Sequence, residues 1–386
     1  MAKNKVVMVV LNPFVNDARV LREAISLAKD GYELTLLAMY RDDLKKSELK
    51  SGFSIIRIPL ISKNWSKHPL IQIIKYIEFV SKCLMKIIRI RPHYLHCHDL
   101  NALPIGVIAK ILILRKTNLI YDSHELWSDS KRDHNHSPKL YSFGIFLERL
   151  LIKLVDRVIV PSKAIGDIIQ KKYQVKSPVL LMNIPNKIIE RKVKNNLLDI
   201  KLPVNSKKIV YVGGVSYGRG IPNLLQALTK LDNNVFLLIL GFDNLENGIS
   251  PLIEKYDLRN RVIQLEPVPP EYVIDAISSA DLGIAPIENI CLSYYYSMPN
   301  KIFEYLLAGL PVAVSNFPEM SRLVLENEVG VVFNPEDPED IATSIKRILD
   351  DPVLFEKLKK NVKMFSENNH WDAEAVKLLK LYSSLA

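Results

Sequence analysis

Apolar segments of strand length alternate with helical segments along this chain, and the alternation starts twice. In the first half, the strands are expected at residues 6–11, 34–38, 55–58, 94–96, 119–121 and 157–160. In the second half, they are expected at 209–212, 235–240, 262–265, 282–285 and 312–314. Alternation of this kind is typical of parallel sheets with helices packed on both faces. The sequence therefore predicts an α/β protein with two doubly wound, Rossmann-like domains.

A polar and basic stretch between residues 187 and 208 separates the two series of strands. A chain of 386 residues is also too long for one ordinary core. We expect a first domain at 1–190, a linker at 191–207, a second domain at 208–365 and a terminal helix at 366–386 that packs back across the domains. Two such domains imply a cleft, with ligands bound beyond the carboxyl ends of the strands.

Composition excludes several classes of protein. The three cysteines, Cys83, Cys97 and Cys291, are far apart, which indicates neither a disulfide framework nor a thiolate zinc site. The first residues lead straight into a short apolar strand without the pattern of a signal peptide, and no apolar run reaches the length of a membrane span. We expect a cytoplasmic protein in a reducing compartment.

Positive charge is concentrated in the first half. Residues 1–200 contain 34 Lys+Arg and 18 Asp+Glu, whereas residues 201–386 contain 18 and 24. Such a domain is expected to meet an anionic partner, a membrane surface or a nucleic acid. The basic amphipathic segment 70–91 has two interpretations: it lies on anionic lipid on the inner face of the membrane, or it covers its own sheet and turns a solvated basic face outward. The sequence contains no recognisable nucleic-acid-binding motif, so we do not expect a nucleic acid as the partner.

The segment 298–311 (MPNKIFEYLLAGLP) predicts a short helix that starts beside Pro299 and stops at Gly309. The start of a helix offers unpaired N–H groups and the positive end of a dipole, to which Lys301 adds an ammonium group. Glu304 lies on the same helix face. A cation beside a carboxylate suits the phosphates and the ribose of a nucleoside diphosphate. The alternative is a surface helix with a solvated Lys and Glu.

A glycine-rich loop follows the strand at 209–212. It contains Gly213, Gly214, Gly218 and Gly220, and Arg219 lies among them. Glycines let a backbone approach a ligand closely, and a guanidinium matches phosphate oxygens. The loop is neither a Walker phosphate loop nor a GxGxxG motif, and a tight strand-to-helix turn explains it nearly as well. Together with Lys301, however, it predicts two cations at the ends of two strands.

Two clusters of polar residues follow strands in the first half, at 96–99 (HCHD) and 122–125 (DSHE). Three interpretations are open: a metal site, a histidine that hydrogen-bonds a sugar or its phosphate, or structural hydrogen bonds in strand-end loops. Alternation along a strand places His96 and His98 on one side. In the first loop, Asp17 is expected to cap the following helix, while Asn16 and Arg19 could face the cleft.

Taken together, these segments resemble retaining GT-B glycosyltransferases of glycosyltransferase family 4 over nearly the whole chain. The resemblance rests on 16–24 (NDARVLREA), 95–106 (LHCHDLNALPIG), 121–125 (YDSHE), 156–165 (DRVIVPSKAI), 211–221 (YVGGVSYGRGI) and 298–312 (MPNKIFEYLLAGLPV). It implies a nucleotide-sugar donor held mainly by the second domain, an acceptor held mainly by the first, and chemistry without a metal or other cofactor.

The resemblance also implies roles for individual residues. Catalysis is assigned to His98, near the transferred sugar, and to the diphosphate-binding Arg219 and Lys301. Glu304 would bind the ribose hydroxyls. The donor is expected to contact Gly213, Gly214, Arg219, Asn300, Lys301 and Glu304, and the acceptor Asn16, Arg19, His124 and Glu125.

The chain departs from the family pattern at two positions. Gly214 stands where an arginine is usual, and Tyr296 stands where many members have a glutamate, eight residues before Glu304. The expected function is transfer of a hexose-type sugar to a glycan or lipid-linked acceptor, in cell-envelope or surface polysaccharide biosynthesis. A GT-B sugar-nucleotide epimerase and a non-catalytic nucleotide-sugar-binding protein are the alternatives.

Overall fold

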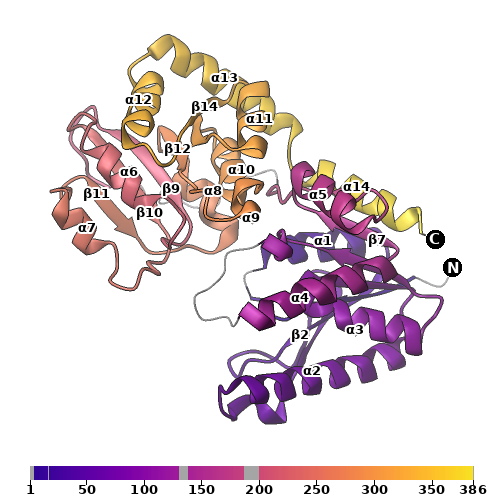
Figure 1. Ribbon diagram of the computed structural model, residues 1–386. Helices are drawn as coiled ribbons and strands as arrows, with labels where there is room; N and C mark the ends of the chain where they lie inside the picture. The colour runs from indigo at the N-terminus through magenta and orange to yellow at the C-terminus, as the bar shows by residue number, and fades with distance from the viewer. Residues whose placement is uncertain (1–3, 16, 130–137, 187–199, 386) are drawn as a thin grey trace. The chain divides into compact units, whose positions relative to one another are not determined.

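The computed structural model describes residues 4–15, 17–129, 138–186 and 200–385. The chain divides into two compact units (Figure 1). The first comprises residues 1–182 and 374–386, and the second comprises residues 183–373. None of the helices in these ranges is long and apolar enough to cross a membrane.

The first unit is built on an eight-stranded sheet with the order β3-β4-β2-β1-β5-β6-β7-β8. All neighbouring strands are parallel except β3 and β4, which form an antiparallel pair at one edge. The strands are β1 (Lys5–Val9), β2 (Glu33–Met39), β3 (Ser47–Lys50), β4 (Phe53–Ile58), β5 (Tyr94–His98), β6 (Asn118–Asp122), β7 (Arg157–Val160) and β8 (Val179–Leu180). Every residue of β5 is buried, as expected for a strand covered on both faces.

Helices connect these strands in the way that parallel pairs require. They are α1 (Ala18–Lys29), α2 (Pro69–Ile90), α3 (Asp99–Leu112), α4 (Pro138–Leu151) and α5 (Lys163–Tyr173), with short 3₁₀ turns η1 (Ile61–Asn64), η2 (Trp127–Asp129) and η3 (Ile152–Leu154). Asp17 caps α1 as predicted, because its carboxylate accepts a hydrogen bond from the Val20 amide.

The second unit has a six-stranded, fully parallel sheet with the order β11-β10-β9-β12-β13-β14. Its strands are β9 (Lys207–Val212), β10 (Val235–Leu240), β11 (Val262–Leu265), β12 (Leu282–Ala285), β13 (Val312–Ser315) and β14 (Gly330–Phe333). Its helical segments are α6 (Ile221–Leu228), α7 (Ser250–Lys255), η4 (Pro270–Tyr272), α8 (Val273–Ile277), α9 (Leu292–Tyr295), α10 (Asn300–Leu307), α11 (Pro318–Glu326), α12 (Pro338–Leu349) and α13 (Pro352–Asn368).

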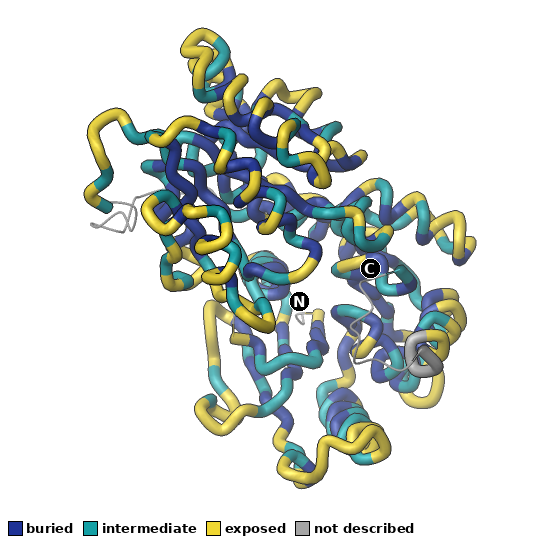
Figure 2. The backbone as a smooth tube through the Cα atoms, turned by 60° about the vertical axis from the view of Figure 1, so that its left-hand side comes forward, coloured by how far each residue is buried: buried dark blue, intermediate teal, exposed yellow. Residues whose placement is uncertain are grey.

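The prediction of two Rossmann-like parallel sheets is confirmed. The strands β10, β11 and β12 have the predicted bounds. Figure 2 shows both sheets as buried backbone, with exposed positions along the outer helices. The apolar segments of the sequence therefore form the strands at the centres of two hydrophobic cores.

The last helix, α14 (Trp371–Ser383), joins the first unit from residue 374 onward. Glu374 accepts a hydrogen bond from the Met182 amide, and the Tyr382 hydroxyl lies 3.0 Å from Nδ1 of His96. The amide of Asn118 donates to the carbonyl of Leu385. The end of the chain thus completes the core of the unit formed by its beginning. The predicted linker, 191–207, lies mostly outside the described residues.

Candidate active site

The helix α10 begins at Asn300, with Pro299 as its N-cap. The extended backbone at Pro299 and its missing N–H suit the position just before a helix. Tyr305, one turn further on, holds the helix against the sheet: its hydroxyl donates to the carbonyl of Ile284 (3.0 Å) and accepts from the amide of Val212 (2.8 Å). These contacts fix the start of α10 beside the carboxyl ends of β9 and β12.

Lys301 is buried, and its ammonium nitrogen lies 3.6 Å from the centre of the Tyr211 ring. Among the described residues, the ammonium has no hydrogen-bond or ion-pair partner. Burial and repulsion by Arg219 lower the pKa of Lys301 well below its ordinary value, against a smaller opposite effect of Glu304. A buried cation that rests on an aromatic ring without a carboxylate partner can accept an anionic ligand.

Gly213 makes room for this ammonium group. Its φ is +113°, and a Cβ atom there would lie 3.4 Å from Nζ of Lys301. The glycine therefore keeps the backbone at the end of β9 close to the lysine, as predicted for the loop.

Arg219 lies in the same loop, half-buried, with its guanidinium carbon 4.7 Å from the centre of the Tyr294 ring. Its charge lowers the pKa of Lys301 and opposes the rise that burial causes in the pKa of Tyr211. The two cations therefore lie close enough to interact, around one tyrosine. Their convergence, predicted from two separate motifs, is present in the structure.

The loop approaches a second backbone segment at Gly214. Val215 donates to the carbonyl of Phe242 (2.8 Å) and accepts from the amide of Asn244 (2.9 Å). A Cβ atom at Gly214 would lie 2.8 Å from Nδ2 of Asn244. The side chain of Asn244 thus occupies the space that a larger residue at position 214 would need.

Asn300 is exposed at the start of α10, and Glu304 is half-buried one turn later. Both positions agree with the predicted helix, on which Lys301 and Glu304 share a face. Their contacts with a donor are predictions. Tyr296 immediately follows the short helix α9, and its ring packs edge-on against Tyr295.

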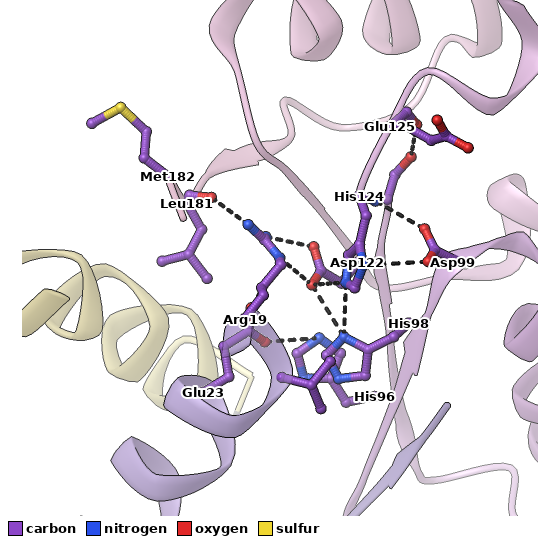
Figure 3. A network of polar contacts seen from close by, with 12 residues as sticks. Arg19, Glu23, His96, His98, Asp99, Asp122, His124, Glu125, Leu181 and Met182 are labelled. Carbon is purple, nitrogen blue, oxygen red and sulfur yellow. Dashed lines mark hydrogen bonds and ion pairs between the residues drawn. The ribbon is translucent and has the colours of Figure 1, made fainter. Parts of the chain in front are cut away.

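In the first unit, Arg19 and Asp122 form a buried ion pair (Figure 3). Nε and one terminal nitrogen of Arg19 donate to the two oxygens of Asp122, at 2.8 and 2.7 Å. The other terminal nitrogen donates to the carbonyl of Leu181 (2.9 Å). Burial alone would raise the pKa of Asp122, but Arg19 and His124 hold it well below its usual range. All three nitrogens of this guanidinium are therefore used within the unit.

Two histidines share the carboxylate of Asp122 with Arg19. Nδ1 of His98 lies 3.1 Å from Oδ2 of Asp122, and Nε2 of His124 lies 3.0 Å from the same oxygen (Figure 3). Burial lowers the pKa of His98, so the neutral ring donates from Nδ1. Its Nε2 is buried without a partner among the described residues.

His124 is positively charged at neutral pH. Burial opposes its charged form, but the carboxylates of Asp99 and Asp122 outweigh burial and raise its pKa to about 9. Asp99 also accepts from the backbone N–H of His124 (3.1 Å) and adopts a φ of +64°, a region that aspartate tolerates better than most residues. The carboxylate thus fixes the loop that carries His124.

Glu23 and His96 complete this cluster. Nε of Arg19 lies 3.2 Å from Oε1 of Glu23, but its hydrogen-bond geometry is met only with Asp122. Burial and the charge of Asp122 raise the pKa of Glu23 well above its ordinary value, and burial and His98 lower the pKa of His96. Burial therefore disfavours charge on both groups, and the cations Arg19 and His124 are paired with the carboxylates of Asp122 and Asp99.

The metal interpretation can be tested on this geometry. Ligand atoms of Glu23, His96, His98 and Asp122 lie within 4.8 Å of one another. However, the rings of His96 and His98 are stacked, 4.3 Å apart and 23° from parallel, so their in-plane lone pairs do not converge. The guanidinium of Arg19 already occupies both oxygens of Asp122. The donor set fits an ion-pair network better than a metal centre.

The structure places His98, Arg19 and His124 in one cluster at the carboxyl ends of β5 and β6. Glu125 is exposed, and its carbonyl accepts from the hydroxyl of Ser123 (2.7 Å). Asn16 lies outside the described residues. The assignment of these positions to acceptor binding stays a prediction.

Three residues of these two clusters were not predicted: Glu23, Tyr211 and Tyr294. A signal existed for Glu23, because it lies one turn from Arg19 on the buried face of α1. No local pattern marks a tyrosine as the platform for a cation that lies 90 residues further along.

Two protein-family models match this chain, and each model covers most of one unit. The family model "Glycosyltransferase Family 4" matches residues 18–182, and the model "Glycosyl transferases group 1" matches residues 194–365. The chain belongs to the group 1, family 4 glycosyltransferases. The fold of these transferases is GT-B, as predicted.

Relatives and solved structures agree with this assignment. The chain spans about half the length of the first curated relatives it matches, such as an uncharacterized glycosyltransferase of Methanocaldococcus jannaschii (26% identical over 181 residues, 46% of this chain and 45% of the relative). A chitobiosyldiphosphodolichol beta-mannosyltransferase of Candida glabrata is 22% identical over 98% of this chain and 91% of its own.

Two solved structures share the fold over nearly the whole chain. Sucrose-phosphate synthase from Thermosynechococcus elongatus has a TM-score of 0.84 at 19% identity and covers 99% of both chains. The Anabaena protein HepE in complex with UDP-glucose has a TM-score of 0.75 at 15% identity and covers 98% of this chain and 99% of its own.

Proposed function

We propose that this family 4 glycosyltransferase moves a hexose-type sugar, with retention of configuration, from a nucleotide-sugar donor to a glycan or lipid-linked acceptor. The proposed setting is cell-envelope or surface polysaccharide biosynthesis in the cytoplasm. The second unit binds the donor, and the first unit binds the acceptor. The observation that carries the proposal is the convergence of Arg219 and Lys301, with Lys301 on the ring of Tyr211 and without a carboxylate ion pair among the described residues.

These cations act on the leaving group. As the bond between the sugar and the diphosphate breaks, negative charge grows on the diphosphate. Fixed positive charges at the start of α10 stabilise that growth more than they stabilise the bound donor. The lysine is suited to this role because, among the described residues, no carboxylate forms an ion pair with its ammonium group. Attack from the leaving-group face, with the diphosphate taking the acceptor proton, gives retention without a metal ion or a protein nucleophile.

His98 is the first-unit residue that faces the transferred sugar in this proposal. Asp122 accepts from its Nδ1, so its Nε2 carries a lone pair that can accept a hydrogen bond from a sugar hydroxyl. The unpartnered state of this buried atom supports the assignment, because buried polar atoms usually find a partner.

The related proteins support the classes of substrate. The Candida relative is named for chitobiosyldiphosphodolichol, and the solved HepE structures contain UDP, UDP-glucose and glucose. A lipid-linked acceptor would require this chain to work at the surface of a membrane.

A thermal-shift screen of UDP, GDP and ADP sugars tests donor binding. A ligand that binds only the folded protein raises the melting temperature according to its affinity. One nucleotide should stabilise the unchanged protein and stabilise Arg219→Ala and Lys301→Ala much less. Arg259→Ala, which removes an exposed arginine of the same unit, is the matched control and should respond like the unchanged protein. Equal shifts in all four proteins would contradict the proposed donor site.

Product analysis separates transfer from its alternatives. An epimerase would change the donor sugar without any acceptor, and a non-catalytic binding protein would release no nucleotide at all. Turnover should persist in the presence of EDTA. The anomeric configuration of the new linkage, determined by nuclear magnetic resonance, tests retention.

A further inference from the structure

The outward face of α2 is apolar. The helix covers its sheet through Phe79, Cys83 and Ile87, as an amphipathic helix should. Its opposite side, however, is a stripe of exposed aliphatic side chains at helical spacing: Leu70, Ile73, Ile74, Ile77, Met85 and Ile88. Leu70 is 64% exposed and Ile77 is 59% exposed. The predicted solvated basic face is therefore absent from this side of α2, where water would ordinarily favour polar residues.

Two polar residues of α2, Lys75 and Glu78, hold the turn η1. Glu78 accepts from the amides of Ile61 and Ser62 (2.6 and 3.0 Å) and from Nζ of Lys82 (2.6 Å). Although burial acts in the opposite direction, these hydrogen bonds lower the pKa of Glu78 to about 2. Lys75 donates to the carbonyls of Lys63 and Trp65. These polar groups are therefore used inside the unit. The exposed Ser81, whose hydroxyl donates to the carbonyl of Glu78, interrupts the aliphatic stripe between Ile77 and Met85.

Large apolar side chains are also exposed on the elements beside α2. The helix α2 contacts η1 and α3, and α3 contacts α4. Figure 1 shows α2 along the lower margin of the first unit, with α3 and α4 following it. Large apolar side chains are exposed on each of these neighbours: Ile61 and Trp65 at η1, Ile111, Leu112 and Ile113 at the end of α3, and Phe143, Phe146 and Leu150 on α4.

Basic residues accompany this surface, and acidic residues are nearly absent. Residues 51–98 contain eight Lys+Arg and a single acidic residue, Glu78. Lys86 is half-buried on α2, Arg89 and Arg91 are exposed at its end, and Lys67 is exposed before its start. A second copy of the chain would bring the same positive charge to the contact and be repelled, whereas an anionic lipid surface would attract it.

We propose that the outer surface of α2, with η1 and the exposed side chains of α3 and α4, is a docking surface for an anionic lipid bilayer. The helix lies in the plane of the interface, with its aliphatic stripe among the acyl chains and its basic residues at the headgroups. Trp65 occupies the interfacial position that this side chain prefers. This docking proposal depends on the proposed function in one respect only: the purpose of docking would be access to a lipid-linked acceptor.

The starts of α2 and α3 connect this surface with the polar cluster of the first unit. The hydroxyl of Tyr76 on α2 donates to the carbonyl of Asn101 in the first turn of α3, and α3 begins directly after His98. The aliphatic stripe therefore starts at the edge of the sheet that carries His98 and His124. A lipid-linked acceptor that lay in the bilayer would have its headgroup near this edge.

Flotation with vesicles tests the docking surface without donor or acceptor. The unchanged full chain should float with vesicles of phosphatidylcholine and phosphatidylglycerol in equal parts, and much less with phosphatidylcholine alone. The double variant Ile74→Ser with Ile77→Ser should bind about tenfold or more weakly, because two aliphatic side chains no longer enter the bilayer. The double variant Lys86→Gln with Arg89→Gln should lose about tenfold on the anionic vesicles only.

Matched controls exist elsewhere in the chain. Leu325→Ser with Val353→Ser removes two exposed aliphatic side chains from the second unit, and Lys163→Gln with Lys171→Gln removes two exposed charges from α5 of the first unit. Both controls should float like the unchanged chain. Unchanged thermal unfolding of each variant would show that the fold is intact, as expected for exposed positions.

Three outcomes would overturn the proposal: no flotation of the unchanged chain, equal flotation of the α2 variants and their controls, or a dimer in sedimentation that Ile74→Ser with Ile77→Ser dissociates while no protein floats. The last result would assign the surface to a second copy. Failure of flotation leaves donor turnover untouched, and loss of donor turnover in Arg219→Ala leaves flotation untouched. The two proposals therefore fail separately.

Discussion

Each unit of this protein holds a cluster of charged residues at the carboxyl ends of its strands, but the two clusters differ in how their cations are paired. In the first unit, Arg19 and His124 contact the carboxylate of Asp122, and the cluster is electrically balanced. In the second unit, Lys301 rests on Tyr211 and is repelled by Arg219. Cations that are already paired with carboxylates need no ligand, whereas cations without carboxylate partners can bind an anionic ligand.

The difference suggests two roles for buried charge. Ion pairs inside a protein fix side chains in place, at a desolvation cost that their mutual attraction offsets. The cluster around Asp122 therefore positions His98 and His124, while Arg219 and Lys301 carry the binding and the chemistry in the proposed function. The following predictions test this contrast, from the largest expected effect to the smallest.

The ion pair of the first unit should be essential for stability. Asp122→Asn leaves the buried guanidinium of Arg19 without its carboxylate and His124 with only that of Asp99. This change should lower the free energy of unfolding by about 3–5 kcal/mol in urea titrations. Glu254→Gln breaks an exposed pair with Arg259 and should cost less than about 1 kcal/mol. An equal decrease in the free energy of unfolding in the two variants would show that the buried ion pair stabilises the protein no more than the exposed pair.

The unpaired lysine of the second unit should matter for turnover and not for stability. Lys301→Met keeps the length of the side chain and should lower kcat by about 10²–10³-fold, since it removes one stabilising charge from the leaving group. The free energy of unfolding should stay the same or rise, because a buried amine that is costly to desolvate is replaced by an apolar side chain. Lys357→Met, at an exposed ion pair of α13, is the control for both measurements. A kcat within about threefold of the original would refute this role.

His124 should make stability depend on pH in the alkaline range. Its pKa is raised to about 9 in the folded protein, above the ordinary value of 6.5. Its contribution is therefore complete below pH 6.5 and is lost as the pH rises through about 9. His124→Gln should remove a contribution of about 2–3 kcal/mol, seen as a flatter plot of unfolding free energy against pH. His68→Gln, at an exposed position, is the matched control for the substitution.

Donor binding should take up a proton at Lys301. Burial and Arg219 lower its pKa in the free protein, and a diphosphate beside the nitrogen would raise it again. Calorimetry in buffers with different ionisation enthalpies should show up to one proton bound per donor, and affinity should fall by up to tenfold per pH unit above the pKa of the free protein. The same proton uptake in Lys301→Met would assign it to another group.

A third cation should add little. Gly214→Arg restores the residue usual for the family, but its side chain has to displace the amide of Asn244. We expect donor affinity to rise by less than about tenfold, measured by thermal shift, with Gly214→Gln as the uncharged control. A larger gain would mean that Lys301 and Arg219 leave most of the diphosphate charge unpaired.

Prediction from the sequence succeeded where the signal is local. The buried strands β10, β11 and β12 are continuous apolar runs, and Asp17 caps the helix that follows it. The strands β3 and β8 were not predicted, because one is mostly exposed and the other has two residues. Their pairing depends on neighbouring strands and leaves little trace in the residues themselves.

By itself, the sequence determined the two α/β domains, the position of α10 and the residue types at the strand ends, because apolar periodicity and helix-stop residues act between close neighbours in the chain. Only the tertiary structure decided which charges are paired. Arg19 meets a carboxylate 103 residues away, and Lys301 meets a tyrosine ring instead. The structure also turned the aliphatic stripe of α2 outward. Partners across such separations are set by the packing of whole sheets and helices, which no short segment encodes.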